Sequence, residues 1–291
     1  MSEPTRPTAA PVPGAVDSLT RFYDQLAADY HLVYADWEAS VARQGASLDA
    51  LLRARLGDAP ADVLDCACGI GTQALGLAAL GHRVTGTDLS PAAVARAARE
   101  AAARGVRLPV AAADMRRLPC ADGRFDAVVC ADNALPHLLT AEDVRAAFAE
   151  LHRVLRPGGL LLLSTRPYDE LRRTRPTSTA PQVSADGGRR TVTFQLWHWH
   201  EDGERYDLEH FRLAQWDARA GGDGGCGDGE EWDGEEWGPV SVRRASYWAL
   251  TRDRLSGFAT EAGFAAVEWL PPAVTGFFQP LLLARAARPA R

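Results

Sequence analysis

The chain has 291 residues, of which 46% are hydrophobic and 24% are charged, so it holds enough apolar material for one large domain or two small ones. Its 32 basic residues against 38 acidic ones give a net charge of −6, which argues against nucleic-acid binding through phosphate attraction. Every basic residue is arginine. The absence of lysine excludes enzymes that form a Schiff base on lysine and P-loop NTPases.

Five cysteines at irregular spacing do not form a disulfide framework, and we expect free thiols in a reducing compartment. The start of the chain, rich in proline and alanine up to Gly14, lacks the apolar stretch of a signal peptide. No run of residues approaches the length of a membrane span. The sequence therefore predicts a cytoplasmic protein without membrane contact.

In chain order, residues 1–16 are predicted to be a disordered lead-in, followed by a single domain over 17–291. Apolar residues recur at spacings of three and four between Asp17 and Leu56, which predicts a helical segment that ends at Gly57. We expect residues 17–57 to form a helical cap.

Between residues 61 and 164, short apolar runs alternate with helical patterns. This alternation predicts a doubly wound, mostly parallel sheet in an α/β fold. Arg156-Pro-Gly-Gly is predicted to be a turn. The expected strands are 61–67, 83–88, 108–112, 125–130 and 160–164, and the expected helices are 73–80, 90–104 and 141–155.

The pattern changes after Arg166. Residues 191–200 and 205–216 alternate in polarity around Glu201-Asp-Gly-Glu, which predicts an antiparallel hairpin. Residues 217–238 hold eight glycines, eight acids and one arginine, and we interpret them as a solvated, flexible insertion rather than an acidic binding arm. The hairpin and this insertion lie within an expected substrate cover over 167–250. A helix over 251–262 and closing strands over 265–270 and 278–284 complete the domain.

Ligands of open α/β sheets bind beyond the carboxyl ends of the strands, so the residues that follow each strand carry the functional information. Gly69 and Gly71 follow the first strand and permit close approach of the backbone to a ligand. Asp88 ends the second strand, where a carboxylate suits two ribose hydroxyls. Asp114 follows the third strand and suits an adenine amino group, with Met115 against the ring. Together these residues predict a nucleoside site.

This set resembles the class I S-adenosylmethionine-dependent methyltransferases from Asp65 to the C-terminus. The similar motifs are Val63-Leu-Asp-Cys-Ala-Cys-Gly-Ile-Gly-Thr, Gly86-Thr-Asp-Leu-Ser, Asp114-Met, Phe125-Asp-Ala-Val-Val-Cys and Leu155-Arg-Pro-Gly-Gly. The resemblance implies a seven-stranded Rossmann-like sheet and S-adenosylmethionine as cofactor. It also implies that Asp65, Ala67, Leu89 and Ala131 line the cofactor site.

The N-terminal motifs Phe22-Tyr-Asp-Gln-Leu-Ala and Tyr30-His-Leu-Val-Tyr-Ala-Asp-Trp-Glu resemble the glycine and sarcosine N-methyltransferase group. That resemblance implies that Tyr23, Trp37 and Arg43 contact the cofactor, the first and last at its methionine end. It also implies that Tyr34 and Asn133 face the acceptor. Arg166 would hold an acceptor carboxylate, although Asp169 or Glu170 is an alternative partner for it.

Methyl transfer from a sulfonium depends mainly on alignment and desolvation, and a neutral amine attacks without an obligatory base. Tyr23, Tyr34 and His137 are the predicted catalytic residues, with His31 a further possible base. His198 and His200 lack a third ligand nearby, so no metal site is predicted.

The acceptor is expected to be a small molecule. Trp197, Trp199 and Trp248 make the expected cover aromatic, which favours C- or N-methylation of an indole-type acceptor in natural-product tailoring. Glycine, sarcosine or a similar small amine is the alternative. A nicotinamide-dependent oxidoreductase and a binding protein without catalysis remain alternatives of other classes, and a homodimer is possible.

Overall fold

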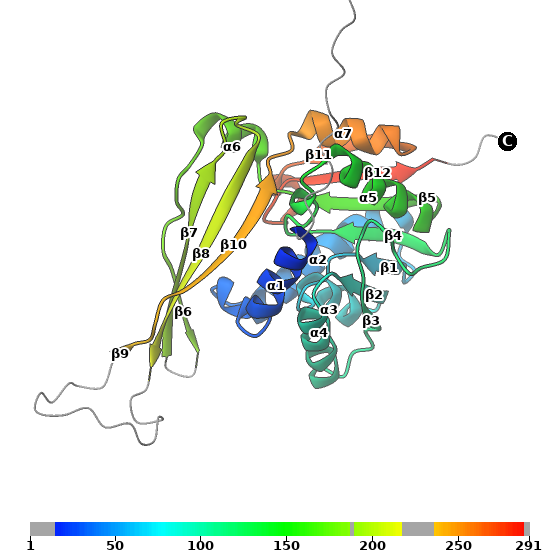
Figure 1. Cartoon of the computed structure of the whole chain (residues 1–291). Helices are drawn as coiled ribbons and strands as arrows, with labels where there is room; N and C mark the ends of the chain where they lie inside the picture. Colours follow the sequence, from blue (N-terminus) through cyan, green and yellow to red (C-terminus); the bar gives the residue numbers. More distant parts are fainter. Residues whose placement is uncertain (1–14, 187–188, 217–235, 288–291) are drawn as a thin grey trace, which may run out of the picture.

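The computed structural model describes residues 15–186, 189–216 and 236–287. Two sheets and eight α-helices lie within these ranges (Figure 1). The expected lead-in over 1–16 and the expected insertion over 217–238 fall mostly outside them. The elements are α1 (Ala15–Leu26), the 3₁₀ helix η1 (Tyr30–Val33), α2 (Trp37–Leu56), β1 (Asp62–Asp65), α3 (Thr72–Ala79), β2 (Arg83–Asp88), α4 (Pro91–Ala103), β3 (Val110–Ala112), β4 (Phe125–Cys130), the 3₁₀ helix η2 (Leu135–His137), α5 (Ala141–Val154), β5 (Leu155–Ser164), α6 (Tyr168–Thr174), β6 (Gln182–Asp186), β7 (Arg189–Trp199), β8 (Arg205–Trp216), β9 (Glu236–Trp237), β10 (Ser241–Trp248), α7 (Arg252–Glu261), β11 (Phe264–Leu270), α8 (Pro272–Thr275) and β12 (Leu281–Ala286).

The larger sheet has seven strands in the order β11-β12-β5-β4-β1-β2-β3. The strands from β5 to β3 pair in parallel, whereas β12 pairs antiparallel with both β5 and β11. The strand order reverses between β1 and β4, which is where an open α/β sheet forms its ligand crevice. The predicted seven-stranded, mostly parallel sheet is therefore confirmed.

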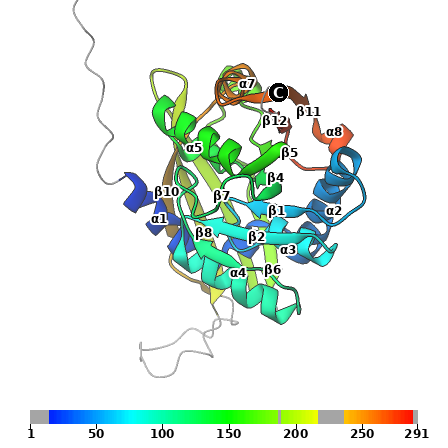
Figure 2. The ribbon, with the colours of Figure 1, turned by 90° about the vertical axis from the view of Figure 1, so that its right-hand side faces the viewer.

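Helices cover both faces of this sheet (Figures 1 and 2). One face packs against α2, α3 and α4 in a buried cluster. This cluster includes Leu48 of α2, Leu75 of α3 and Ala93 of α4. The other face packs against α5 and α7, with Phe148 and Leu255 at the centre. Because both faces are covered, the central strands are almost wholly apolar, as expected for a parallel sheet. No helix in the described ranges has the length and apolar character needed to cross a membrane.

The second sheet is antiparallel, with strand order β10-β8-β7-β6, and β9 pairs with β8. The predicted hairpin is present as β7 and β8, with Trp199 opposite Tyr206. Strands β6 and β10 were not expected from the sequence, since Arg243 and Arg244 interrupt any apolar alternation in β10. The segment expected to cover the substrate therefore forms a sheet rather than a single hairpin.

Two other expectations need correction. The helical segment over 17–56 is broken into α1, η1 and α2, and Asp36 begins α2 by accepting a hydrogen bond from the Ala39 amide. Arg156-Pro-Gly-Gly is not a separate turn, because it lies inside β5. There the pairing with β4 shifts register between Phe125 and Ala127, so these residues form an irregular strand segment.

Helix α1 lies between the two sheets (Figure 1). Phe22 and Leu26 on this helix pack against Tyr206 and Tyr247 of the second sheet. On its other side, Asp24 Oδ1 accepts hydrogen bonds from Ser90 Oγ at 2.5 Å and from the Ala92 amide at 3.1 Å. Ser90 is the N-cap of α4, so one carboxylate ties α1 to the start of α4.

Helices α2 and α3 touch at a pair of glycines. A Cβ built on Gly76 would lie 2.5 Å from the Val41 carbonyl oxygen and 2.8 Å from Gly45 Cα. Neither atom belongs to a flexible side chain, so the contact leaves no room for a larger residue. This close approach holds α3 against α2 directly behind the first strand–helix turn.

We expect Gly76→Ala to lower the free energy of unfolding by about 1–3 kcal/mol, because the added methyl group overpacks a backbone contact. Gly257→Ala is the matched control, since it is also helical and its Cβ would meet nothing within 4 Å. That control should be neutral or stabilising by about 0.5–1 kcal/mol. Urea unfolding of the three proteins measures both effects, and equal stability of Gly76→Ala and wild type would contradict the packing argument.

Candidate cofactor and acceptor pocket

A cavity of about 260 Å³ lies at the carboxyl ends of β1, β2 and β4. The N-terminal tyrosines and residues 244–246 of β10 close it from the opposite side. Both sheets therefore contribute residues to one partly open pocket at the predicted crevice. Ten of the predicted site residues line it: Tyr23, Tyr34, Ala67, Gly69, Asp88, Leu89, Asp114, Met115, Ala131 and His137.

The turn between β1 and α3 forms the floor of the pocket. Gly69 and Gly71 adopt φ values of 52° and 100°, a left-handed conformation that favours glycine. A Cβ on Gly69 would meet nothing within 4 Å, so its backbone faces open space. Gly71 does not line the cavity but is the N-cap of α3. The Gly69 amide donates to Asp88 and the Gly71 amide to the Cys68 carbonyl oxygen, so these bonds hold the turn beside a space that a ligand can fill.

Asp88 lies at the tip of β2. Its Oδ2 accepts a hydrogen bond from the Gly69 amide and its Oδ1 accepts one from the Ser90 amide, both at 2.8 Å. Burial raises the pKa of Asp88, although these two amides partly oppose the effect. A carboxylate offers about four acceptor positions. The two amides use two of these positions, which leaves two acceptor positions of Asp88 for ligand hydroxyl groups.

Asp114 and Met115 also line the cavity, but the carboxylate of Asp114 is already engaged. Arg116 donates to both of its oxygens, with its Nη2 at 2.6 Å from Oδ2. A second acid, Asp143, accepts from Arg116 at 2.5 Å. Despite some burial, the hydrogen bonds from Arg116 hold the pKa of Asp114 below its usual value. Arg116 was not expected from the sequence, and it fixes this acid as an ionised wall of the pocket.

Asp65 was predicted to line the cofactor site, but it lies beneath the same turn with no exposed surface and does not line the cavity. Neither of its oxygens has a well-formed hydrogen bond within the described chain. Burial raises the pKa of Asp65 to about 7, and the nearby amides of Ala67 and Ala74 only partly oppose this. A buried acid without a donor is costly to ionise, so this site gains from any cation that binds nearby.

Tyr23 and His137 form a pair across the pocket. Tyr23 Oη lies 2.6 Å from His137 Nε2, and His137 Nδ1 lies 3.2 Å from the Ser246 carbonyl oxygen. Because a carbonyl only accepts, Nδ1 carries the proton and Nε2 accepts from the phenol. Burial lowers the pKa of His137 to about 3 and raises the pKa of Tyr23. Both side chains are therefore neutral at ordinary pH.

Asp132 is the most notable residue that the sequence analysis missed. It follows β4, lines the pocket, and accepts hydrogen bonds on Oδ2 from Tyr34 at 2.9 Å and Tyr30 at 3.3 Å. The rule applied to Asp88 and Asp114, that acids just after strands bind ligands, would have found it. The analysis selected its neighbour Asn133 instead.

Several predicted site residues do not line the cavity. Arg43 is exposed on α2 and donates to Ser40 Oγ at 3.1 Å. Trp37 is buried, and its indole N–H donates to Thr72 Oγ1 at 2.9 Å, so it supports the start of α3 from behind. The structure therefore does not bring Arg43, predicted at the methionine end of the cofactor, or Trp37, predicted to contact the cofactor, to the pocket lining.

Asn133 and Arg166 lie behind the pocket wall. Asn133 is buried, and its Oδ1 accepts from the Arg166 amide at 3.1 Å. The guanidinium of Arg166 lies over the rings of Trp197 and Tyr247 at 4.8 Å and 5.2 Å and donates to Tyr206 Oη at 2.7 Å. Its side chain is held among aromatic rings, while its alternative partner Asp169 forms an ion pair with Arg252.

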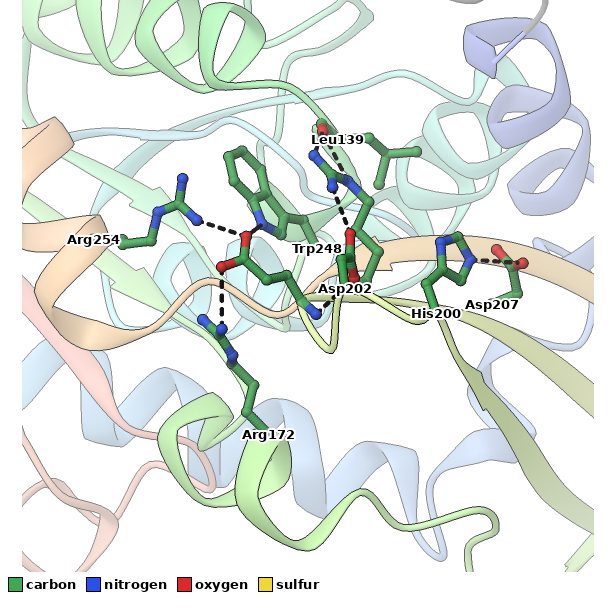
Figure 3. Close-up of polar contacts among 9 residues, drawn as sticks. Leu139, Arg172, His200, Asp202, Asp207, Trp248 and Arg254 are labelled. Atoms are coloured by element: carbon green, nitrogen blue, oxygen red, sulfur yellow. Dashed lines mark hydrogen bonds and ion pairs between the residues drawn. The ribbon is translucent and has the colours of Figure 1, made fainter.

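The tryptophans expected to cover an aromatic acceptor lie elsewhere. Trp197 is buried and stacks on Tyr206 at 4.8 Å. Trp248 is buried where the second sheet meets α7, and its indole N–H donates to Glu204 at 3.3 Å (Figure 3). Arg254 and Arg172 bind the same carboxylate at 2.7 Å and 3.1 Å. These rings therefore stabilise the second sheet and do not line the cavity.

The remaining histidines that the sequence singled out also lie outside the cavity lining. His31 Nδ1 lies 3.1 Å from an Arg96 guanidinium nitrogen. His198 lies on β7 and contacts Glu209 at 3.2 Å, and His200, which directly follows β7, contacts Asp207 at 3.0 Å. These contacts give each of the three a local partner.

The burial of Asp65 leads to a prediction about stability and pH. Because its folded pKa of about 7 exceeds the value of about 3.9 in unfolded chains, the native state binds more protons between these limits. Its contribution to the free energy of unfolding therefore falls as pH rises from about 4 to about 7. We expect Asp65→Asn to match wild type below about pH 4 and to be more stable at pH 8, by roughly 2–4 kcal/mol.

Urea unfolding at several pH values measures this difference. Other titrating groups are common to both proteins and cancel when the two curves are subtracted. A constant difference between pH 5 and pH 8 would show that Asp65 titrates alike in the folded and unfolded states.

Known proteins that are similar to this chain agree with the nucleoside site that the pocket suggests. Residues 63–159 match the methyltransferase domain family. A glycine/sarcosine N-methyltransferase of Parasynechococcus marenigrum is 38% identical over 137 residues, which cover 47% of this chain and 48% of that protein. A demethylmenaquinone methyltransferase of Thermus thermophilus is 41% identical over 114 residues, or 38% of this chain and 50% of that protein. The chain thus spans about half the length of the curated relatives it matches.

Solved structures agree in fold over nearly the whole chain. CalS10, an amino pentose methyltransferase of Micromonospora echinaspora, has a TM-score of 0.65 at 23% identity, covering 89% of this chain and 95% of its own. KedS8, a sugar N-methyltransferase of Streptoalloteichus, has a TM-score of 0.64 at 22% identity, covering 99% of each chain. The resemblance drawn from the sequence is confirmed: residues 63–159 are a methyltransferase domain, and the chain has the fold of the class I S-adenosylmethionine-dependent methyltransferases.

Proposed function

We propose that this protein is an S-adenosylmethionine-dependent methyltransferase that acts on an amine nitrogen of a small molecule. The observation that carries the proposal is the cavity at the reversal of strand order, lined by acids at successive strand ends. The methyltransferase domain at residues 63–159 supports the reaction class.

The residues present fit the cofactor. Asp88 has two acceptor positions free for the ribose hydroxyls, and Met115 lines the cavity where a purine ring would lie beside Asp114. The buried, unpartnered carboxylate of Asp65 favours a cationic ligand above it. When bound, S-adenosylmethionine supplies an electrophilic methyl group on a good leaving group, so the protein has mainly to bind, orient and exclude water.

The size of the cavity supports a small acceptor. A space of about 260 Å³ is close to the lower end of the size range of sites for small molecules. Residues of α1 and β10 line the side opposite the sheet, so an acceptor held there would be partly shielded from solvent. This shielding matches the need to keep water from the reaction.

The side chains that line the cavity favour an amine over an indole as the methyl acceptor. The aromatic reading depended on Trp197 and Trp248, and both are buried away from the cavity. The walls that do face the acceptor space are the polar phenols of Tyr23, Tyr30 and Tyr34 with Asp132. Names of similar proteins, such as glycine/sarcosine N-methyltransferase and sugar N-methyltransferase, point the same way.

The cofactor half of the proposal predicts the effect of Asp88→Ala. Loss of two hydrogen bonds to ligand hydroxyls should weaken S-adenosylhomocysteine binding by about 1–3 kcal/mol, as measured by isothermal titration calorimetry. Asp62→Ala is a suitable control because Asp62 is at the opposite end of β1 and pairs with Arg83 and Arg156. Unchanged affinity in Asp88→Ala would place the ribose elsewhere.

The acceptor half is tested with matched compounds and methyl-labelled S-adenosylmethionine. Tryptamine and tryptophol share an indole and differ in the amine, and glycine and sarcosine test the smallest amines. We expect label on nitrogen in the amines and none in tryptophol, with the attacked atom identified by mass spectrometry. Methylation of an indole carbon in tryptophol would restore the aromatic hypothesis and contradict this one.

A further inference from the structure

The carboxylate of Asp132 lies in the pocket wall without a cationic partner. Tyr34 and Tyr30 donate to its Oδ2 at 2.9 Å and 3.3 Å, and Gln279 approaches Oδ1 at 3.5 Å. Within the described ranges no arginine or histidine forms an ion pair with it, and Arg166 acts on it only through longer-range attraction. One oxygen is thus held by two phenols, whereas the other retains most of its capacity to accept.

The surroundings of Asp132 suit a positive charge. The rings of Tyr23 and Tyr30 lie 6.4 Å apart, those of Tyr30 and Tyr34 lie 6.1 Å apart, and all three line the same cavity. Aromatic faces attract cations through their quadrupoles. A carboxylate beside three such rings is an arrangement that recognises an ammonium group better than a neutral hydroxyl.

The backbone conformation of Asp132 is unusual and is held in place by hydrogen bonds. Asp132 adopts φ of 54°, a left-handed conformation that costs most residues about 1 kcal/mol and that aspartate and asparagine tolerate best. Its amide donates to Ser164 Oγ at 2.8 Å, and Ser164 in turn donates to Gln279 at 2.8 Å. Strained positions that the surroundings hold in place are concentrated at functional sites.

The neutral polar groups that share the cavity wall with Asp132, three phenols and one imidazole, are poor proton acceptors. Burial raises the pKa values of Tyr23, Tyr30 and Tyr34, so these phenols stay protonated. His137 already accepts a hydrogen bond from Tyr23, and burial lowers its pKa to about 3. Burial instead raises the pKa of Asp132, although Tyr34, Arg166 and Tyr30 oppose the effect. Its carboxylate is therefore the group best matched to take a proton from an ammonium ion.

We propose that Asp132, with the rings of Tyr30 and Tyr34, binds the ammonium form of the acceptor and removes the proton that must leave before methylation. This inference rests on the proposed function, because it names the group that selects an amine. In the step, R–NH₃⁺ gives one proton to the carboxylate and becomes R–NH₂, and Asp132 becomes a neutral acid. The nitrogen lone pair then forms the bond to the methyl carbon while the carbon–sulfur bond breaks with its electron pair on sulfur.

The test is direct binding of simple probes to the whole protein saturated with S-adenosylhomocysteine. Benzylammonium and benzyl alcohol have nearly the same shape, as do ethylammonium and ethanol, so each pair isolates the charge. We expect each ammonium ion to bind roughly tenfold more tightly than its alcohol, which is the scale of one charge-assisted hydrogen bond. Equal binding within each pair, or no ammonium binding, overturns the proposal. This comparison needs no variant.

Two variants assign the effect to a residue. Asp132→Asn keeps the shape and the tolerance of positive φ, and we expect it to lose the preference for ammonium while binding S-adenosylhomocysteine as wild type does. Asp126→Asn is the matched control, because Asp126 lies on β4, the strand that Asp132 follows, and pairs with Arg156 away from the pocket. It should keep the preference.

The two proposals fail in different ways. Weakened S-adenosylhomocysteine binding in Asp132→Asn would overturn this inference, because the carboxylate would then serve the cofactor's own ammonium group. No binding of S-adenosylhomocysteine to the wild-type protein would contradict the proposed function itself. The thermal midpoint of each unliganded variant, measured alongside, shows whether it is folded.

Discussion

Uncompensated negative charge at the carboxyl ends of β2, β1 and β4 is the constraint around which the rest of the site is built. Asp65, Asp88 and Asp132 each have a raised pKa because burial penalises the carboxylate, and none has a basic residue in contact within the described chain. Enclosed carboxylates are stable only when hydrogen bonds or a cation offset their lost hydration. Backbone amides serve Asp88 and phenols serve Asp132. The negative charge that these hydrogen bonds do not offset can attract a ligand that carries positive charge, such as a sulfonium nucleoside.

The aromatic residues of the second sheet pack against one another and stabilise the sheet, and most of them do not contact the pocket. Trp197, Tyr206 and Tyr247 form a stacked series, and the guanidinium of Arg166 lies against two of these rings. Since Tyr247 also lies 4.1 Å from the His137 ring, this series reaches the pocket from behind. The sheet thus braces the wall that faces the acceptor, whereas the tyrosines of the N-terminal segment supply its surface.

Much of the larger sheet could be predicted because parallel strands buried on both faces read as continuous apolar runs, as in Leu160–Ser164. The same logic found Asp88 and Asp114, since residues at strand ends are exposed to ligands whatever the details of packing. Strand β10 could not be predicted, because its arginines pair with acids on neighbouring elements, such as Glu209 with Arg244. The roles of Trp197, Trp248 and Arg166 could not be judged either. Residue type shows that an aromatic ring or a cation is present, but only tertiary packing decides whether it faces a cavity or a core.

The hydrogen bonds of Asp24 to Ser90 and Ala92 carry a consequence for traffic through the site. The helix that bears Asp24 also bears Tyr23, so any displacement of α1 wide enough to admit an acceptor withdraws a wall of the pocket and strips the start of α4 of its anion at once. Because α4 follows the strand that ends in Asp88, the Tyr23 wall of the pocket and the helix next to the tip of β2 are mechanically linked through this one carboxylate.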